Sequence, residues 1–217
     1  KMANQETAFG LRPIGLVGSA ANSTGLTTYE IASNNTNVIY NGAIVVPLAG
    51  GVIDQAGATD GGTTQALGVM MGCEYVDSVT KKTTFLNHWP GSAAISVDTN
   101  HPVKALVADD PNQLLKVASD ASLTDRATAL TAVFANASLG TSARTGSDDT
   151  GRSNSALGVS TIATTATLPL RIVGILDDEA NSDFAAAGIP LIVRLNAHFN
   201  AGSRRFDSQT TADSTGI

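Results

Sequence analysis

The chain has 217 residues, a formal net charge of −6 at pH 7 and only 15% charged residues, whereas an average globular protein has about 25%. This acidic balance excludes the basic surface that nucleic acids and anionic membranes require, so neither is expected as a partner. A hydrophobic content of 42% excludes a disordered chain. The scarcity of Glu, Lys and Arg argues against long helices and favours a mainly β protein.

Short apolar runs separated by Gly, Asn, Asp and Pro predict strands and turns along the whole chain. Residues 1–15 are expected to form an extended N-terminal arm, in which Phe9, Leu11 and Ile14 alternate with glycine and proline. These first residues contain no long apolar run, so no signal peptide is expected. The first strand of the main body is predicted over 27–31.

Asn41-Gly42 separates two apolar runs, at 38–40 and 43–46. Both residues of an Asn-Gly pair adopt positive φ readily, which predicts a hairpin across this dipeptide. Pro47 should confine the second strand to an edge or an end, since proline cannot donate a ladder hydrogen bond.

A second hairpin is predicted in the middle of the chain. LGVMMGCEYV, at 67–76, is typical of a buried strand, and TTFLNHW, at 83–89, returns after a polar turn. Gly68 and Gly72 are expected to mark bulges or close backbone approaches. Further strands are predicted at 94–97, 103–108, 114–117, 168–176 and 191–199, the last with the clearest alternation of polar and apolar residues.

The segment 125–139 is ambiguous. Its apolar residues fit one face of a helix, yet Thr128, Leu130 and Phe134 also fit one face of a strand. The β-branched Thr128, Thr131 and Val133 favour the strand.

About ten short strands predict an antiparallel β-barrel or β-sandwich with long loops and little helix. Residues 16–202 are expected to form this single β domain. Within it, 140–155 is predicted to be a long polar loop, mobile or held by a partner, and 177–188 to hold one helical turn. Residues 203–217 have the composition of a tail.

The residues that most often carry chemistry show no catalytic pattern. His88, His101 and His198 are too far apart in sequence for a typical zinc site, so no metal is expected. Cys73 lies in an apolar run without a neighbouring positive charge, which indicates a buried, inert thiol. Trp89 is expected to fill the core or a subunit contact.

The acidic groups and glycines also favour structural roles. The acid pairs at 109–110, 148–149 and 177–179 lie where turns are predicted, and none matches a calcium loop. Phosphate-binding glycine loops and a G-x-S-x-G elbow are absent from the sequence. We therefore expect a protein that is not an enzyme and has no cofactor.

Six sets of residues along the chain form recognisable short motifs: AFGLRPIG at 8–15, LGV at 67–69 with Glu74-Tyr75, HWP at 88–90, DDPN at 109–112, LRIVG at 170–174 and VRLN at 193–196. These segments resemble structural proteins of tailed bacteriophages, notably those of marine phages. They are short, but together they span most of the chain.

The resemblance implies a capsid decoration or cement protein, which sits outside the shell, commonly as a trimer. It implies a virion protein that is assembled in the host cytoplasm and binds the major capsid protein on the capsid exterior as a homotrimer. Phe9, Leu11, Arg12 and Ile14 are then expected to anchor the arm to its partner. Two alternatives stay open: a head-fibre, tail or receptor-binding β module, and a β-fold enzyme such as a polysaccharide lyase or a head-associated protease.

Overall fold

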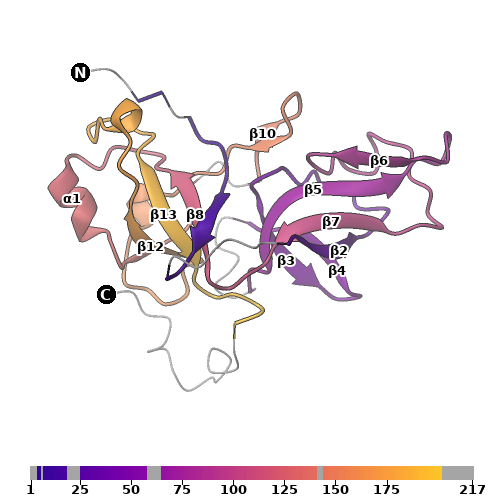
Figure 1. The fold of residues 1–217 in the computed structure, drawn as a ribbon, viewed down its shortest axis with the longest axis horizontal. Coiled ribbons are helices and arrows are strands. Elements are labelled where there is room, and N and C mark those ends of the chain that lie inside the picture. The colour runs from indigo at the N-terminus through magenta and orange to yellow at the C-terminus, as the bar shows by residue number, and fades with distance from the viewer. Residues whose placement is uncertain (1–3, 6, 19–24, 58–64, 141–143, 202–217) are drawn as a thin grey trace.

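The computed structural model describes residues 4–5, 7–18, 25–57, 65–140 and 144–201. Two β units lie side by side along the long axis of the molecule, a closed barrel at one end and an open sheet at the other (Figure 1). The prediction of a mainly β fold with little helix is confirmed, and the architecture contains a barrel.

Five strands form the barrel: β2 (Thr27–Ile31), β3 (Ile44–Leu48), β4 (Val52–Gln55), β5 (Gly68–Val76) and β7 (Val103–Ala108). They are ordered β3-β4-β2-β7-β5, and the pairing of β3 with β5 closes the ring. β6 (Thr83–Leu86) pairs with β5 and extends the sheet beyond the ring.

The open sheet is antiparallel throughout and contains five strands in the order β1-β8-β13-β12-β9. They are β1 (Arg12–Leu16), β8 (Gln113–Ala118), β13 (Pro190–Leu195), β12 (Leu170–Ile175) and β9 (Asn136–Ala137). The remaining elements are the hairpin β10 (Gly146–Ser147) and β11 (Arg152–Ser153), the helix α1 (Arg126–Thr131) and two 3₁₀ turns, η1 (Val159–Thr161) and η2 (Glu179–Asn181).

Two hydrophobic cores hold these units, and β3 belongs to both. Val45 points into the barrel, where it packs with Met70 and Trp89. Its neighbours Ile44 and Val46 point outward, into a second core that includes Leu115 and Ile172 of the open sheet. Successive strand residues face opposite sides, so the unbroken apolar run of β3 reflects burial on both faces.

The second predicted hairpin is confirmed as β5 and β6, and both of its marked glycines have the expected role. The register of β5 against β7 slips between Met70 and Gly72, as a bulge requires. A Cβ at Gly68 would collide with the carbonyl oxygen of Ala108, which indicates a close backbone approach.

The predicted hairpin across Asn41-Gly42 is wrong. The dipeptide does lie in a tight turn, but its flanking segments pair with other parts of the chain. Ile39 pairs with Trp89, with N–H···O distances of 2.8 and 2.9 Å. The Gly42 carbonyl accepts a hydrogen bond from the Leu11 N–H at 2.8 Å. Nonlocal partners therefore take the backbone groups that a local hairpin would use.

The preference for a strand within 125–139 is also wrong over 126–131, where α1 forms. Asp125 caps this helix, because its carboxylate accepts the backbone N–H of Thr128 at 2.7 Å. The chain leaves the helical region at Phe134, with φ of 72°, and only Asn136 and Ala137 form a short strand. One capping hydrogen bond outweighs the weak β preference of the threonines.

The polar segment predicted as a long loop is a hairpin over its described residues 144–155. Tyr40 Oη donates to Asp148 at 2.7 Å, Asn41 N donates to the Gly151 carbonyl at 2.9 Å, and Asn87 Nδ2 donates to Thr150 O at 2.6 Å. This segment is therefore held by its own chain. The predicted tail at 203–217 lies outside the described residues.

The structure agrees more closely with the other predicted elements. The strands expected at 103–108, 114–117 and 168–176 form as β7, β8 and β12, and η2 supplies the helical turn expected within 177–188. The segment 94–97 makes an isolated bridge to Asp77 at Val97 and is not a strand.

Candidate functional site: the outer face of the open sheet

The N-terminal segment packs along its own chain. Leu11 is fully buried in the core between the barrel and the open sheet, and Phe9 is 8% exposed. The N–H of Gly10 donates to Ser155 O at 3.1 Å, and the side-chain amide of Asn4 donates to Ala187 O at 2.8 Å. Leu11 therefore has no surface to offer a partner, although it was expected to be an anchor.

Two of the four expected anchors do reach the surface. Arg12 begins β1 and is partly exposed, opposite Lys116 of β8. Ile14 is 43% exposed, where the register of β1 slips between Pro13 and Gly15. Both residues lie on the edge strand of the open sheet, so the surface around them is the candidate interaction site.

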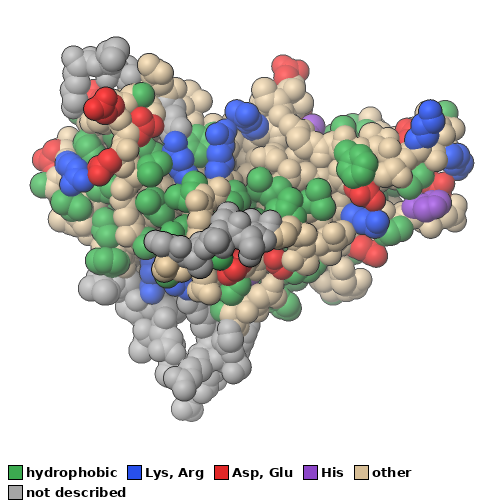
Figure 2. Space-filling model, in the orientation of Figure 1, with side chains coloured by type: hydrophobic (Ala, Val, Ile, Leu, Met, Phe, Trp, Pro, Cys, Tyr) green, Lys and Arg blue, Asp and Glu red, His purple; other side chains and the backbone are tan. Residues whose placement is uncertain are grey.

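The two faces of the open sheet differ sharply. The inner face is buried and carries Leu115, Val117, Leu170, Ile172, Leu191, Val193 and Leu195. The outer face is partly exposed and carries, by strand alternation, Arg12, Leu114, Lys116, Arg171, Val173, Ile192 and Arg194. We call this second set the outer face. Figure 2 shows basic side chains beside hydrophobic ones in the region of β1, β8 and β13.

The four basic residues of the outer face form one continuous row. Arg12 lies directly opposite Lys116, and Arg171 lies directly opposite Arg194. Lys116 is opposite Ile192, two residues before Arg194, so Lys116 and Arg194 are diagonal neighbours about 7–8 Å apart. The row crosses β1, β8, β13 and β12, and it contains four of the 13 basic residues of the chain.

Phe9 supports one end of this row. The Cζ of Arg12 lies 4.6 Å from the centroid of the Phe9 ring, and the Nζ of Lys116 lies 5.4 Å from it. A cation over an aromatic face is attracted by the ring quadrupole. Phe9 thus acts as a platform under two like charges rather than as an exposed anchor.

The row also has neighbours that moderate its charge. Arg171 donates from Nε to the side-chain oxygen of Asn136 at 3.1 Å. The pKa of Asp178 is lowered, first by the hydrogen bond from the Asn181 side chain and then by the Ala180 N–H, with a smaller contribution from the charge of Lys116. The row is therefore anchored to its surroundings and not loosely displayed.

The histidines and the cysteine have structural surroundings. The His88 ring stacks on Tyr40 with centroids 5.9 Å apart, and burial lowers the His88 pKa. Burial raises the pKa of Cys73 to about 12, and its thiol donates to the His88 carbonyl at 3.2 Å. The buried His198 accepts the backbone N–H of Asn200 at 3.0 Å. The prediction of a buried Cys73 is confirmed.

Trp89 fills the barrel core, as expected, since its side chain is fully buried. Its indole N–H donates to the Asn35 carbonyl at 3.2 Å, and its ring meets Tyr75 edge-on. This position fixes the loop between β6 and β7 against the barrel.

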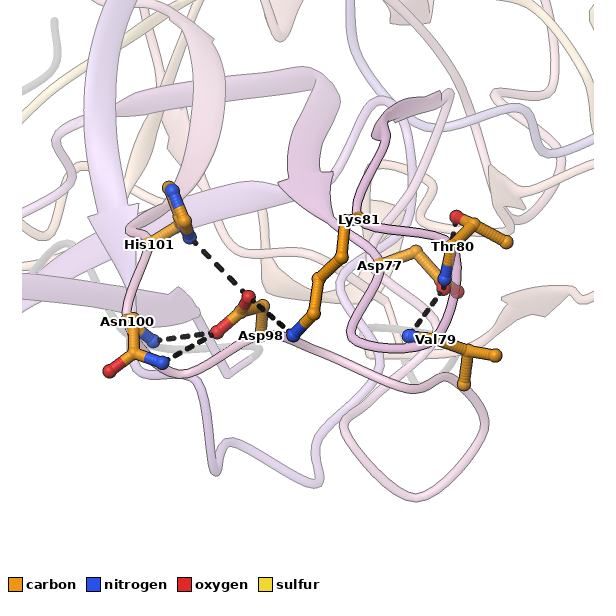
Figure 3. Close-up of polar contacts among 7 residues, drawn as sticks. All are labelled: Asp77, Val79, Thr80, Lys81, Asp98, Asn100 and His101. Carbon is orange, nitrogen blue, oxygen red and sulfur yellow. Dashed lines mark hydrogen bonds and ion pairs between the residues drawn. The ribbon is translucent and has the colours of Figure 1, made fainter.

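His101 belongs to a polar cluster at the tip of the barrel (Figure 3). The Asp98 carboxylate, only 6% exposed as a residue, accepts from Lys81 Nζ at 3.0 Å and from the Asn100 backbone at 3.1 Å. His101 Nδ1 lies 3.6 Å from the same carboxylate. The Asn100 N–H, and then Lys81, lower the pKa of Asp98 to about 2. This cluster ties the β5–β6 turn to the next loop.

Two of the three acid pairs stabilise turns, as predicted. Asp110 accepts the backbone N–H of Asn112 at 2.7 Å, and Asp178 accepts that of Ala180 at 3.0 Å. Beside α1 lies a depression of about 270 Å³, and two of the charged residues that line it, Arg126 and Asp177, pair with each other at 3.1 Å. Their side chains are 53% and 80% exposed, so this ion pair is solvated.

Within the described part of the chain, no group of three or more His, Cys, Asp or Glu side chains could hold a metal ion. None of the helices described is long and apolar enough to cross a membrane. No family model, no curated protein and no solved structure matches the chain. The outer face of the open sheet combines basic and aliphatic side chains on one surface.

Proposed function

We propose that this protein is a non-enzymatic structural protein of a tailed-bacteriophage virion, which decorates the capsid by binding the major capsid protein. It does so as a homotrimer on the capsid exterior, after assembly in the host cytoplasm. The observation that carries the proposal is the outer face, where a basic row and aliphatic side chains share one sheet. Such a mixed face suits docking on another protein.

Two further observations support this proposal. The short segments that resemble phage structural proteins include the start of β1, the core of β12 and the end of β13, which are three of the five strands of the open sheet. In addition, the described histidines, the cysteine and most of the acid pairs make contacts that hold turns and cores together.

The direct test is to mix the purified protein with capsids of the phage that encodes it, prepared without this protein. The proposal expects saturable binding and density on the outside of the shell in electron cryomicroscopy. Native mass spectrometry should give a trimer of about 66 kDa, three times the 22.1 kDa chain. Density confined to the tail or to a head fibre would contradict the proposal and favour the alternative virion roles.

A further inference from the structure

Two large hydrophobic side chains, Leu130 and Phe134, are exposed where α1 ends, at the end of the molecule remote from the barrel (Figure 1). Each residue is about half exposed. Single apolar side chains are common on protein surfaces, so their exposure alone says little. The backbone of Phe134 and the groove beside it make this place different.

Phe134 has a φ of 72°, in the left-handed region that bulky residues rarely adopt. Helices commonly end on a residue in this conformation, and glycine or asparagine is the usual choice. The Phe134 N–H donates to Ile172 O at 2.8 Å, so the fold uses the backbone of this turn. The half-exposed ring gains little from its own chain in return for the strain, which points to a contact outside the chain.

A groove of about 260 Å³ lies beside α1 at the same end of the molecule. Its apolar lining consists of Leu123, Ala132, Val159 and Ile162, and the other lining residues are serine and threonine. An apolar cavity of about 150 Å³ is large enough to bind benzene. The groove therefore has room for the phenyl ring of a phenylalanine.

The surface around the ring and the groove is poor in charge. Charged residues are absent from 127–140 and from 153–170, which supply most of it. These two segments lie side by side, because Asn136 and Ala163 exchange two backbone hydrogen bonds of 2.8 and 2.9 Å. An uncharged surface with an exposed aromatic ring has the composition of an interface core.

The charge of the chain favours a second copy as the occupant. Copies with a net charge of −6 repel one another, and an uncharged surface opposes their contact least. The carboxylates of Asp120 and Asp125 border the groove, but each already accepts a backbone N–H, at 2.9 and 2.7 Å. The ring and the groove are complementary in size and polarity, so this surface matches a copy of itself.

We propose that the surface around α1 is a self-association site, in which Phe134 of one copy enters the groove of the next copy. The ring and the groove are separate parts of the chain. Each copy therefore gives one contact and receives another, and such head-to-tail contacts build a closed ring when the rotation fits. The number of copies in the ring, three, rests on the proposed function.

Sedimentation equilibrium of the full-length protein over a range of concentrations measures this association. Phe134→Asn removes the ring and keeps a residue that accepts positive φ, so the variant should fold. It should weaken association by more than about tenfold, as loss of a central aromatic contact does. Thr128→Arg should weaken association as much, because Thr128 is an exposed helical residue that lines the groove.

The matched controls are Phe85→Asn and Val79→Arg. They make the same kinds of change at exposed positions in β6 and in the β5–β6 turn, at the other end of the molecule. Both controls should associate as the unaltered protein does.

A mixture of the two groove-and-ring variants gives a sharper result. Phe134→Asn keeps the groove and Thr128→Arg keeps the ring, so the mixture should form pairs of about 44 kDa, twice the 22.1 kDa chain, and nothing larger. An unaltered protein that stays monomeric, equal weakening in the controls, or a mixture as monomeric as its components would each overturn the inference.

Capsid binding is measured separately, so the two proposals can fail independently. If the protein decorates capsids but Phe134→Asn and Thr128→Arg associate like the unaltered protein, the contact is refuted while the function stands. If association depends on Phe134 and Thr128 but capsids stay undecorated, the function fails and the self-association site remains.

Discussion

At the scale of single residues, the N-terminal segment depends on a glycine where it enters the body. Gly10 has φ of 77°, and a Cβ there would lie 2.7 Å from the carbonyl oxygen of Gly42. Few side chains adopt this backbone conformation without strain, and the neighbouring turn leaves no space. The segment before β1 is therefore fitted to its own chain over Gly10 and Leu11.

Gly10→Ala should lower the free energy of unfolding by about 1–3 kcal/mol, since strain and collision act together. Gly15→Ala is the matched control, because nothing lies within 4 Å of a Cβ at that position in β1. Urea unfolding measures both. Equal stability of the two variants would mean that the segment does not pack as described.

The Asp98 cluster makes stability depend on acid pH. The pKa of Asp98 is lowered to about 2 from its ordinary value of 3.8. Its ionised form therefore stabilises the fold above pH 3.8, and this contribution disappears as the pH falls toward 2. Thermal unfolding between these pH values should show a smaller loss of stability for Asp98→Asn than for the unaltered protein. The exposed Asp149→Asn should behave as the unaltered protein does, and an unchanged slope in Asp98→Asn would contradict the assignment.

At the scale of elements, one side-chain contact at the N-terminus stabilises α1. Asp125→Ala removes the side-chain acceptor for the Thr128 N–H and should cost about 1 kcal/mol of stability. Asp125→Ser keeps an acceptor at the cap and should restore most of that loss. Denaturant unfolding of both variants tests this expectation, and an equal cost for alanine and serine would count against the cap.

Strands with strong local patterns could be predicted from the sequence, while pairings between distant segments could not. The alternation in 191–199 identified β13 and its buried side, which carries Leu191, Val193 and Leu195. The hairpin predicted at Asn41-Gly42 failed because its flanks bind Trp89 and Leu11, far away in sequence. Local turn chemistry sets which conformations are available, and tertiary partners select among them.

The candidate site, too, could be predicted only in part from the sequence. Arg12 was named from the sequence, and Arg194 was seen to share the polar side of its strand. That these residues belong to one row depends on the registers of β1, β8, β13 and β12, which no local pattern specifies. Leu11 was mistaken for an anchor, because an apolar residue in a short segment looks alike whether it binds a partner or its own core.

At the scale of the whole molecule, the few basic residues are unevenly distributed over the surface. Four of the 13 basic residues lie in one row on the outer face, while the chain as a whole is acidic. The rest of the molecule is consequently more acidic than the net charge of −6 suggests. The basic charge of the chain is thus concentrated on the outer face of the open sheet, whereas the other surfaces carry most of the acidic groups.

Because Leu11 is buried, deletion of the N-terminal segment is a poor test of its contacts with a partner. Deleting residues 2–12 would remove a fully buried core residue together with Arg12, and loss of a buried leucine alone costs about 2–5 kcal/mol. A truncated chain that fails to bind would therefore report unfolding rather than a lost contact. Surface substitutions on the outer face avoid this confusion.

The most direct measurement is a reconstruction, by electron cryomicroscopy, of capsids decorated with this protein. The account predicts trimers on the outside of the shell, with the outer face of the open sheet turned toward the major capsid protein. Capsids mixed with Arg12→Gln/Arg194→Gln should show clearly lower occupancy than capsids mixed with Lys82→Gln/Arg152→Gln. Bare capsids, or trimers whose outer faces point into solvent, would contradict the account.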